Sequence, residues 1–420
     1  MKPASLSSFL VQVLFAWQSA HSQSPLGSDS ESPSTRYGLV PDPSITVSTP
    51  LFSDLERLAR LVDISYCIGN TGVHKPFDCL SRCKEFPRLV LKTTWSTGML
   101  LGDSCGYIAL DRGNREAGDS DKLRPVSREI EDGAIVVALR GTYSIANAVA
   151  DLSMAPQEYM PYPAPGDDNE DHPGGKETSP GTKHHRCDNC TVHMGFWQSW
   201  QSARKTVLPE LKALRTKYPT HRIQLVGHSL GGAVACLAAL ELKLSLGWDN
   251  VVATTFGEPR VGNYQLSRFI DWAFDLDGTS GLEQRSYRRV THNGDPVPML
   301  PLEEWGYRPH GGEIYISKRE LQPAEEDVRV CVGDSDPSCS AGLQVPLLED
   351  VRRLFRFVPS STSTQQFVAA GEKSLPTRFK LWQLFFAHRD YFWRLGLCVP
   401  GGDPANWGRG RFDQEEFYEL

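Results

Sequence analysis

The chain has 420 residues, 40% of them hydrophobic, which is enough for one large domain or two ordinary ones with a substantial core. Its formal net charge is -7, so it lacks the basic field that attracts phosphate groups. These values argue against nucleic acid as a partner. Chemistry on small molecules or lipids stays open.

The N-terminus has the pattern of a secretory signal peptide. Residues 1–22 begin with Lys2, continue through an apolar stretch from Phe9 to Trp17 and end in small residues. This order is typical of an export signal rather than of a short buried helix. The polar segment 23–50, rich in Ser and Pro, predicts a flexible linker. No later run approaches the ~18 apolar residues of a membrane span, so we expect a secreted protein without a transmembrane segment.

Ten cysteines fit an oxidising compartment. Six of them form three closely spaced pairs in polar, loop-like stretches, which predicts local disulfides: Cys79 with Cys83, Cys187 with Cys190, and Cys331 with Cys339. The stretch His184–Cys190 also has the residue types of a zinc site, but no second ligand pair accompanies it, so the disulfide is favoured. Asn189-Cys190-Thr191 is an N-glycosylation sequon, and a bridge at Cys190 is expected to hinder its use.

Hydrophobic periodicity predicts that helices and strands alternate along most of the chain. We expect helices over 51–64, 194–214, 233–244 and 264–274, and strands over 107–110, 134–139, 223–226, 251–256, 287–291 and 314–316. This alternation indicates an α/β protein, with a mostly parallel central sheet and helices on both faces. A single domain over 51–420 would carry loop insertions at about 157–186, which is acidic, and at about 319–378, which looks irregular.

Gly227-His228-Ser229-Leu230-Gly231 matches the G-x-S-x-G pattern between a buried-type strand and a helix of small residues. A nucleophilic Ser needs this geometry, because on a strained strand-to-helix turn only glycines at both flanks avoid the neighbouring backbone. The helix N-terminus also favours developing negative charge. An ordinary Gly-rich turn with a capping Ser is the alternative, which the strand and helix context disfavours. We predict Ser229 as the nucleophile and the backbone N–H of Leu230 as one oxyanion donor. His228 is not expected to be the base, since adjacent residues on such a turn point apart.

An acid and a base should follow the nucleophile in the chain order Ser, acid, His. Asp295 lies in a loop after the predicted strand 287–291, where the acid is expected. An Asp in a surface turn is the alternative for Asn-Gly-Asp-Pro. Two histidines, His310 and His388, follow Asp295. Pattern alone leaves the choice between them open.

At these positions the chain resembles the class 3 fungal lipases, which are α/β-hydrolases and include triacylglycerol lipases and feruloyl esterases. The resemblance covers most of residues 50–318 and the stretch near 385–398. It rests on five segments in the expected order: 137–142, 192–196, 227–232, 255–263 and 293–298.

The resemblance implies several further assignments. In the family the catalytic His precedes a Tyr-Phe pair and a cysteine, which fits His388, while His310 matches a non-catalytic His before a strand. The segment 140–142 matches the oxyanion loop, so Thr142 would supply the second donor. Cys67 would bridge Cys398, and the pairs Cys79–Cys83 and Cys187–Cys190 match local family bridges. That leaves Cys236, which we expect to be a buried free thiol, and Cys105, which has no clear partner.

A short amphipathic helix is predicted after Thr142, because Ile145, Val149 and Leu152 recur at helical spacing. Beside the resemblance it looks like a lid that covers the site in water and meets lipid when open. On periodicity alone, a small core helix is the alternative.

We therefore expect a secreted carboxylic ester hydrolase, a triacylglycerol lipase with the triad Ser229, Asp295 and His388 and an acyl-enzyme intermediate. No metal or cofactor is expected. The partner would be a lipid or ester substrate, with an oil–water interface as one place of contact, and the sequence does not determine the oligomeric state. A feruloyl-type esterase or a phospholipase is the alternative enzyme. A non-catalytic lipid-binding relative is a further alternative, against which the complete triad argues.

Overall fold

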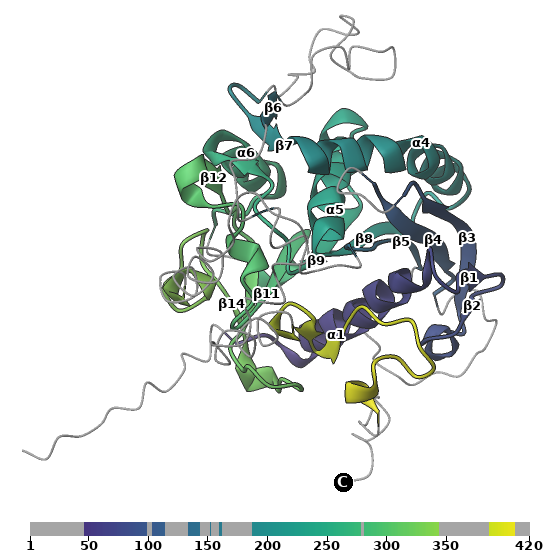
Figure 1. Cartoon of the computed structure of the whole chain (residues 1–420). Helices are drawn as coiled ribbons and strands as arrows, with labels where there is room; N and C mark the ends of the chain where they lie inside the picture. Colours follow the sequence, from purple (N-terminus) through teal and green to yellow (C-terminus); the bar gives the residue numbers. More distant parts are fainter. Residues whose placement is uncertain are drawn as a thin grey trace, which may run out of the picture. The chain divides into compact units, whose positions relative to one another are not determined.

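The computed structural model (Figure 1) describes residues 46–98, 103–113, 133–142, 152, 159–161, 187–278, 281–343 and 386–407. These residues all belong to one compact unit, Asp42–Leu420. Several predicted features lie outside the described residues: the signal peptide 1–22, the linker up to residue 45, the lid helix apart from Leu152, most of the loop 157–186, and residues 344–378 of the second insertion.

An eight-stranded sheet forms the centre of this unit, in the order β14-β13-β11-β9-β8-β5-β4-β3. The neighbouring strands from β5 to β13 are parallel: β5 (Ala134–Leu139), β8 (Arg222–His228), β9 (Val251–Phe256), β11 (Tyr287–His292) and β13 (Glu313–Ile316). Antiparallel strands extend both edges: β3 (Leu89–Ser96) and β4 (Cys105–Asp111) beyond β5, and β14 (Val328–Val330) beyond β13. The predicted mostly parallel sheet of an α/β-hydrolase fold is confirmed.

Helices cover both faces of the sheet (Figure 1). Helix α1 (Thr49–Ile64) packs on one face, and α4 (Met194–Lys217), α5 (Leu230–Leu240) and α6 (Tyr264–Phe274) share the core on the other. The side chains of β5 alternate between these cores: Ile135, Val137 and Leu139 face α4 and α5, whereas Ala134, Val136 and Ala138 face α1. A strand that is buried on both faces is therefore apolar throughout.

The structure differs from the sequence-based expectation in short elements. Helix α1 begins two residues earlier than predicted, at Thr49, and is capped by Ser48, whose hydroxyl accepts from the N–H of Leu51 at 3.5 Å. Residues 328–330, within the stretch predicted to be irregular, form the edge strand β14. A second, four-stranded sheet also escaped prediction; its strands are β6 (Tyr159–Pro161), β7 (Thr191–His193), β10 (Gly262–Asn263) and β12 (Tyr307–Arg308). Strands of two or three residues are too short to show a period.

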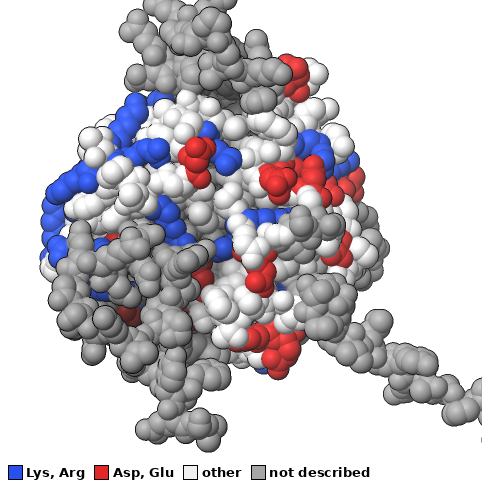
Figure 2. Space-filling model, turned by 180° about the vertical axis from the view of Figure 1, so that it is seen from behind, with Lys and Arg blue, Asp and Glu red and all other residues white. Residues whose placement is uncertain are grey.

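Helix length and surface charge bear on which partners the chain can contact. No helix in the part of the chain that the structure describes is both long and apolar enough to cross a membrane. The face in Figure 2 carries Lys and Arg as well as Asp and Glu side chains, with uncharged areas between them.

Four disulfides are formed, and all four pairs were predicted: Cys67–Cys398, Cys79–Cys83, Cys187–Cys190 and Cys331–Cys339. Cys105 and Cys236 are free and buried. The Cys67–Cys398 bond joins residues that are 331 positions apart and so connects the end of α1 with the C-terminal part of the described chain.

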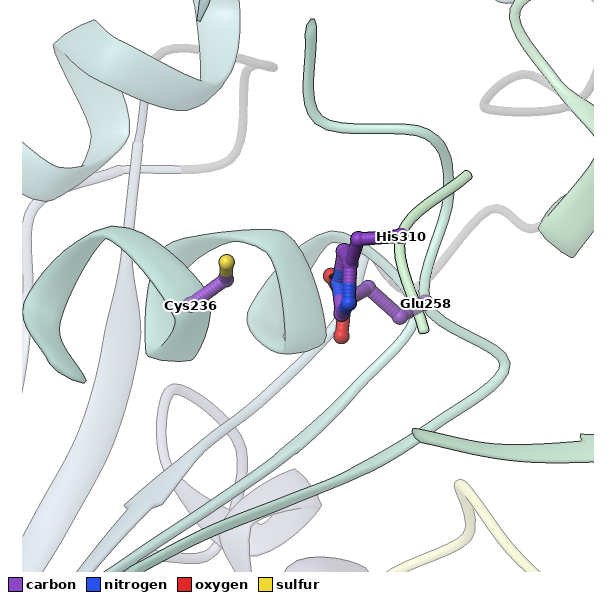
Figure 3. Close-up of side chains that lie close together, drawn as sticks. All are labelled: Cys236, Glu258 and His310. Atoms are coloured by element: carbon purple, nitrogen blue, oxygen red, sulfur yellow. Dashed lines mark hydrogen bonds and ion pairs between the residues drawn. The ribbon is translucent and has the colours of Figure 1, made fainter. Parts of the chain in front are cut away.

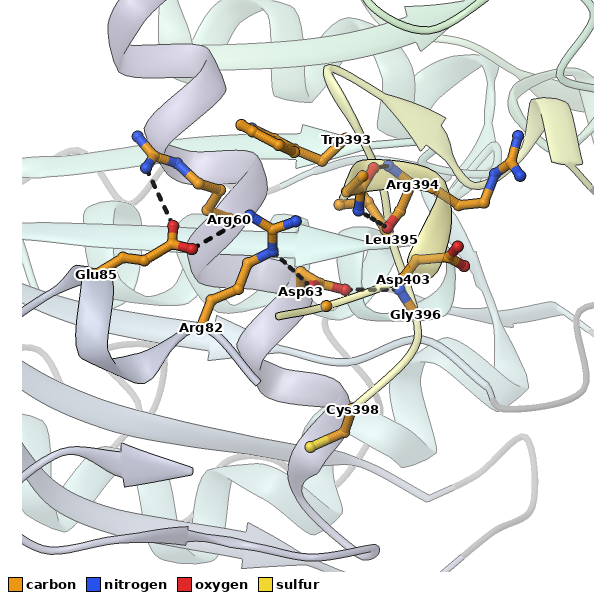
Figure 4. A network of polar contacts seen from close by, with 12 residues as sticks. Arg60, Asp63, Arg82, Glu85, Trp393, Arg394, Leu395, Gly396, Cys398 and Asp403 are labelled. Carbon is orange, nitrogen blue, oxygen red and sulfur yellow. Dashed lines mark hydrogen bonds and ion pairs between the residues drawn. The ribbon is translucent and has the colours of Figure 1, made fainter. Parts of the chain in front are cut away.

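A network of polar contacts reinforces this connection (Figure 4). The Asp63 carboxylate, fully buried near the end of α1, accepts a hydrogen bond from the Gly396 N–H at 2.8 Å and lies 3.6 Å from the Arg82 guanidinium. The same guanidinium lies 4.3 Å from the centre of the Trp393 ring. Together with the long-range disulfide, these contacts fasten the segment that follows His388 to α1.

We expect the double substitution Cys67→Ser and Cys398→Ser to lower the free energy of unfolding by roughly 2–5 kcal/mol, because the lost cross-link closes a very long loop. The control is Cys331→Ser with Cys339→Ser, whose bridge spans a sequence separation of only 8 and should cost less. Urea unfolding of the purified protein measures both. An equal loss in the two variants would contradict the role given to the long-range bridge.

Candidate active site

Ser229 stands on the turn between β8 and α5 in a strained backbone conformation. Its φ is 57° and its ψ is -130°, and only three other non-glycine residues of the described chain have positive φ. Such a conformation costs free energy and persists only where the surroundings impose it. Here the Ser229 N–H donates to the carbonyl of Phe256 at 2.9 Å, which ties the turn to the end of β9. The predicted strand–Ser–helix geometry is present.

The two glycines of the motif allow the backbone to approach closely. A Cβ on Gly227 would lie 2.1 Å from the carbonyl oxygen of Gly231, and one on Gly231 would lie 2.3 Å from that of Leu139. Real Cβ atoms essentially never come so close to another atom. Any larger residue at either position would therefore force the turn open and displace Ser229.

Asp295 and His388 meet although they are 93 residues apart. The Nδ1 atom of His388 lies 3.0 Å from Oδ1 and 2.9 Å from Oδ2 of Asp295. Both side chains are fully buried. Asp295 follows β11, and His388 lies in the turn before β15 (Asp390–Tyr391). The structure thus pairs the predicted acid with the predicted base.

The Asp295 carboxylate is held in its ionised form. Burial by itself raises its pKa, but the His388 ring, the Tyr391 hydroxyl and the Val297 N–H outweigh that effect, and the pKa of Asp295 lies below its ordinary value. Tyr391 donates its O–H to Oδ2, and Val297 donates its N–H to Oδ1 at 2.9 Å. An ionised carboxylate at this place orients the His388 ring and stabilises a positive charge on it.

The other ring nitrogen of His388 is left without a partner. Its Nε2 is buried and has no hydrogen-bond partner in the described structure. A buried polar atom without a partner is costly, so a native structure that keeps one calls for an explanation. A reaction in which this nitrogen accepts a proton and returns it would explain the open position.

The segment that was predicted to form the oxyanion loop lies against the nucleophile. A Cβ on Gly141 would lie 2.7 Å from the Cβ of Ser229, so the loop and the turn are in direct contact. The neighbouring Thr142 hydroxyl is buried and has no hydrogen-bond partner among the described residues. Leu230 is the first residue of α5, where backbone N–H groups have no partner within the helix. The two predicted donors, Leu230 and Thr142, therefore directly follow Ser229 and Gly141, which are in contact.

Sequence reasoning missed three residues that contact this site. Tyr391 binds the acid, and the sequence showed it only as part of a Tyr-Phe pair. The His228 ring lies next to the ring of His388, and its Nε2 is 2.7 Å from the backbone carbonyl of His388. Its Nδ1 is hydrogen-bonded to the Tyr66 hydroxyl. No local pattern marks Tyr66, which lies 162 positions before His228.

His310 belongs to a different buried cluster (Figure 3). Its Nε2 lies 3.0 Å from Oε1 of Glu258, and its Nδ1 lies 2.9 Å from the carbonyl of Gly311. The same carboxylate accepts from the hydroxyls of Thr255 at 2.5 Å and Tyr287 at 2.8 Å. The structure therefore keeps His310 apart from Asp295 and gives both of its ring nitrogens a partner.

Cys236, Glu258 and His310 are the residues of this second cluster that could hold a metal ion, because their ligand atoms lie within 4.8 Å of one another. Glu258, however, already accepts hydrogen bonds from His310, Thr255 and Tyr287. Burial, with the nearby Glu258 charge, raises the pKa of the Cys236 thiol well above its ordinary value and so disfavours the thiolate that binds metals. These contacts account for the cluster without an ion.

A strained Ser at the C-terminal end of a central parallel strand, followed in the chain by an Asp and by a His that contacts it, is the arrangement of a serine hydrolase on the α/β-hydrolase fold. Neither the chain order nor the positions on the sheet depart from that class.

Comparison with known proteins identifies the family within this class of hydrolases. The model of the family described as lipase (class 3) matches residues 136–305. A secreted mono- and diacylglycerol lipase 2 of Gibberella zeae is 57% identical over 408 residues, which cover 97% of this chain and 96% of the relative. Lipase A of Sodiomyces alcalophilus is 57% identical over 374 residues, 86% of each chain. The crystal structure of the Lip2 lipase of Yarrowia lipolytica has a TM-score of 0.61 and 26% identity, and the match covers 84% of this chain and 97% of that one. The chain belongs to the class 3 lipase family, and it is a secreted serine ester hydrolase.

Gly257 provides a test of this geometry. It has a φ of +60°, and a Cβ there would lie 2.8 Å from Cε1 of His388 and 3.0 Å from Oδ2 of Asp295. We expect Gly257→Ala to lower kcat/KM for ester hydrolysis by about 10²-fold or more, because it displaces the paired side chains by a fraction of an ångström to an ångström.

The matched control is Gly247→Ala, since Gly247 has a similar φ of +63° but no atom within 4 Å of the place that an added methyl group would take. Both variants carry the same backbone strain, so only the crowding of His388 and Asp295 distinguishes them. Equal activities of the two variants, measured on a soluble ester, would contradict the arrangement described.

Proposed function

We propose that this protein hydrolyses the ester bonds of acylglycerols, with Ser229 as nucleophile, His388 as general base and acid, and Asp295 as the group that orients His388. The observation that carries the proposal is the state of the His388 ring. One nitrogen is held by an ionised carboxylate, and the other has no partner in the described structure. This is what a base needs before it accepts a proton from a neighbouring hydroxyl.

In the first half of the reaction the Ser229 Oγ attacks the ester carbonyl carbon while its proton passes to Nε2 of His388. The carbonyl oxygen becomes an oxyanion. When the tetrahedral intermediate collapses, the bond to the alcohol oxygen breaks and His388 gives its proton to that oxygen. The products are a free alcohol, such as a glyceride with one acyl chain fewer, and an acyl group bound to Ser229.

In the second half a water molecule replaces the alcohol and the steps run in reverse. His388 takes a proton from the water, the hydroxide attacks the acyl carbon, and the proton returns to Oγ as the fatty acid leaves. Asp295 keeps its charge throughout and stabilises the imidazolium that forms twice in each cycle.

The oxyanion is proposed to be bound by the backbone N–H of Leu230 and by Thr142, through its N–H with help from its hydroxyl. Such donors act mainly in the transition state, where the charge develops, and each is worth ~3 kcal/mol. Two observations support this assignment: Gly141 contacts Ser229, and the Thr142 hydroxyl has no hydrogen-bond partner among the described residues.

Acylglycerols are the substrate class that the relatives favour, since one of them is named as a secreted mono- and diacylglycerol lipase. We propose that partial glycerides and triacylglycerols are both hydrolysed, and that the amphipathic segment 145–152 forms a lid that opens at a lipid surface. The alternatives are soluble aromatic esters and phospholipids, which differ in the shape of the acyl and alcohol pockets.

We also propose that residues 1–22 are removed on export and that the predicted linker, which ends where Ser48 caps α1 and not at residue 50, precedes one catalytic domain with the insertions 157–186 and 319–378. The charge, length and end of the apolar stretch support the cleavage. N-terminal sequencing of the protein from the culture medium of a yeast host tests it: a chain that still begins at Met1 would contradict it.

Replacement of the triad gives the most direct test of the mechanism. We expect Ser229→Ala, Asp295→Asn and His388→Ala each to lower kcat by about 10⁴-fold or more, because the three groups act as one unit. A fluorophosphonate probe should label the wild-type protein at Ser229, as peptide mass spectrometry shows.

The control for the base is His310→Ala, which removes another buried His with a carboxylate partner at 3.0 Å. We expect this variant, where it folds, to keep measurable turnover and labelling. Loss of turnover in the folded His310 variant together with retained turnover in the His388 variant would reverse the assignment.

Thr142→Val tests the oxyanion donor. It keeps the shape of the side chain and removes the hydroxyl, so we expect kcat to fall by roughly 10-fold to 10²-fold with little change in KM. Thr254→Val is the matched control, since the Thr254 hydroxyl in β9 is also buried and without a hydrogen-bond partner among the described residues. A fall of the same size in both variants would exclude a specific role for Thr142.

The substrate class is tested with emulsified mono-, di- and triacylglycerols against a soluble feruloyl ester and a phospholipid. We expect the acylglycerols to be hydrolysed fastest, and the rate on a short-chain glyceride to rise sharply once its solubility limit is passed and a surface forms. Faster hydrolysis of the soluble aromatic ester would rule out the lipase proposal and leave the nucleophile assignment intact.

A further inference from the structure

His228, the residue before the proposed nucleophile, has a partner on each ring nitrogen. Its Nε2 lies 2.7 Å from the backbone carbonyl of His388, and its Nδ1 lies 2.5 Å from the Tyr66 hydroxyl. A carbonyl oxygen only accepts, so Nε2 must carry the proton and donate it. Nδ1 is then the acceptor, and the Tyr66 O–H is the donor. The contacts therefore define one tautomer of a neutral ring.

The surroundings keep the His228 ring neutral. The side chain is fully buried, and burial, with the nearby His388, lowers the pKa of His228 to about 3. The rings of His228 and His388 lie 4.7 Å apart, centre to centre. A charged His228 would repel the imidazolium that forms on His388 during the reaction, so a neutral ring is the compatible one.

Tyr66 extends these contacts to the proposed oxyanion loop. A Cβ on Gly141 would lie 2.8 Å from the Tyr66 hydroxyl, so the hydroxyl is in direct contact with this loop. Tyr66 belongs to the short helix Ser65–Cys67 at the end of α1, and it is fully buried. Its neighbour Cys67 is bonded to Cys398. The hydroxyl is thus held in place by the covalent link between α1 and the segment after the base.

These contacts form a continuous chain from one side of the site to the other. Gly141 lies against the Tyr66 hydroxyl, and hydrogen bonds then run from that hydroxyl to Nδ1 of His228 and from Nε2 of His228 to the carbonyl of His388. The first residue precedes the proposed donor Thr142, and the last carries the base. None of these contacts uses the Nε2 of His388, which has no hydrogen-bond partner among the described residues.

We propose that Tyr66 and His228 are positioning residues that hold the oxyanion loop and the backbone of the base at a set separation on either side of Ser229. The inference rests on the proposed function of Ser229, His388 and Thr142. It assigns to the His of the G-H-S-L-G sequence a role that the reaction scheme does not contain. Catalysis depends on both groups reaching the same tetrahedral intermediate, and a loss of alignment on the ångström scale costs about 10²-fold in rate.

The test compares variants that keep one of the two His228 contacts. His228→Gln places an amide N–H near the position of Nε2 and keeps the donor to His388, whereas His228→Asn keeps a polar atom near Nδ1 and loses that donor. We expect kcat on a p-nitrophenyl ester to fall roughly 10-fold for the Gln variant and about 10²-fold for the Asn variant, with KM nearly unchanged.

Tyr66→Phe removes the hydroxyl with little change of shape, and we expect it to lower kcat about 10-fold or more. Its matched control is Tyr107→Phe, because Tyr107 is equally buried and its hydroxyl also makes a backbone contact, to Leu61 at 2.8 Å, away from the site. The control should lose stability to urea and keep its kcat. In the double variant Tyr66→Phe with His228→Ala, the losses should be smaller than the product of the single losses, because one chain of bonds is broken twice.

The outcomes distinguish a failure of the proposed function of Ser229 from a failure of the positioning role of Tyr66 and His228. Wild-type protein that no fluorophosphonate labels at Ser229 would remove the proposed function itself. Labelled and active wild-type protein, with folded Tyr66 and His228 variants that match it in kcat or that differ from it only in urea stability, would overturn the positioning role. Losses that multiply in the double variant would overturn the coupling between Tyr66 and His228.

A second inference concerns Asn189 and is independent of the first. Asn189-Cys190-Thr191 is the only N-x-Ser/Thr sequence in the chain. Asn189 is exposed, at a φ of 58°, in the tight turn that the Cys187–Cys190 disulfide closes. Its backbone carbonyl accepts from the Asn263 side chain at 2.8 Å, whereas no hydrogen bond of the described residues uses its own side-chain amide.

We infer that Asn189 carries an N-linked glycan that is attached before the Cys187–Cys190 bridge closes. A bond forms between Nδ2 of Asn189 and C1 of the first sugar, and the bond from C1 to the diphosphate of a lipid-linked oligosaccharide breaks. The amide proton leaves with the lipid diphosphate. The closed turn holds Asn189 in a left-handed conformation. The enzyme that transfers the glycan therefore binds the sequon more easily before the turn is closed.

Protein secreted from a yeast host and treated with an endoglycosidase tests this inference. We expect a loss of mass of one glycan in part of the wild-type population, none in Asn189→Gln or Thr191→Ala, and a larger glycosylated fraction when Cys187 and Cys190 are both replaced by Ser. A wild-type mass that the enzyme leaves unchanged would overturn the site. An unchanged glycosylated fraction without the bridge would overturn the order of the two events.

Discussion

Ser229 adopts a backbone conformation that residues with a side chain rarely tolerate, and the elements on either side hold it there. The strand β8 ends and α5 begins without a loop between them. Gly227 and Gly231 make this possible, because a side chain at either position would clash with the neighbouring backbone. Because the turn is imposed by packing, the side chain it presents has little freedom. The roles proposed for the Asp295–His388 pair and for the segment 140–142 all depend on the position of this hydroxyl.

The proposed base, His388, comes from a distant part of the chain and contacts Asp295. Closing a long loop costs little more than closing a short one, so the 93 residues between Asp295 and His388 do not prevent the pairing. The pairing needs the chain next to His388 to be held in place. The Cys67–Cys398 bond and the contact of Asp63 with Gly396 hold it there, since they attach the chain just beyond His388 to α1.

Two histidines in this protein contact a buried carboxylate, and the contact alone does not distinguish a catalytic residue from a structural one. His310 has a partner on both nitrogens, Glu258 on one and the Gly311 carbonyl on the other. His388 has Asp295 on one nitrogen and none on the other in the described structure. Gly257 and Glu258 are adjacent in the chain, yet a Cβ on Gly257 would crowd His388 whereas Glu258 binds His310. Gly257 thus borders the Asp295–His388 pair, and the next residue, Glu258, belongs to the buried cluster of His310.

Local sequence was sufficient for features that depend on neighbours a few residues apart. Helical and strand periods predicted α1, α6, β5 and β9 almost to their ends, and the spacing of glycines around Ser229 predicted the sharp turn. The short disulfide loops followed from cysteine spacing in the same way.

Tertiary structure decided the contacts between distant residues. Chain order alone left His310 and His388 equal, and only the folded chain shows which of them lies against Asp295. The bonds of Tyr66 to His228 and of Tyr391 to Asp295 have no local signal, and neither does the edge strand β14. The reason is physical: a turn or a period is set by the steric and hydrophobic preferences of adjacent residues, whereas a contact across many residues exists only after every element between them has packed.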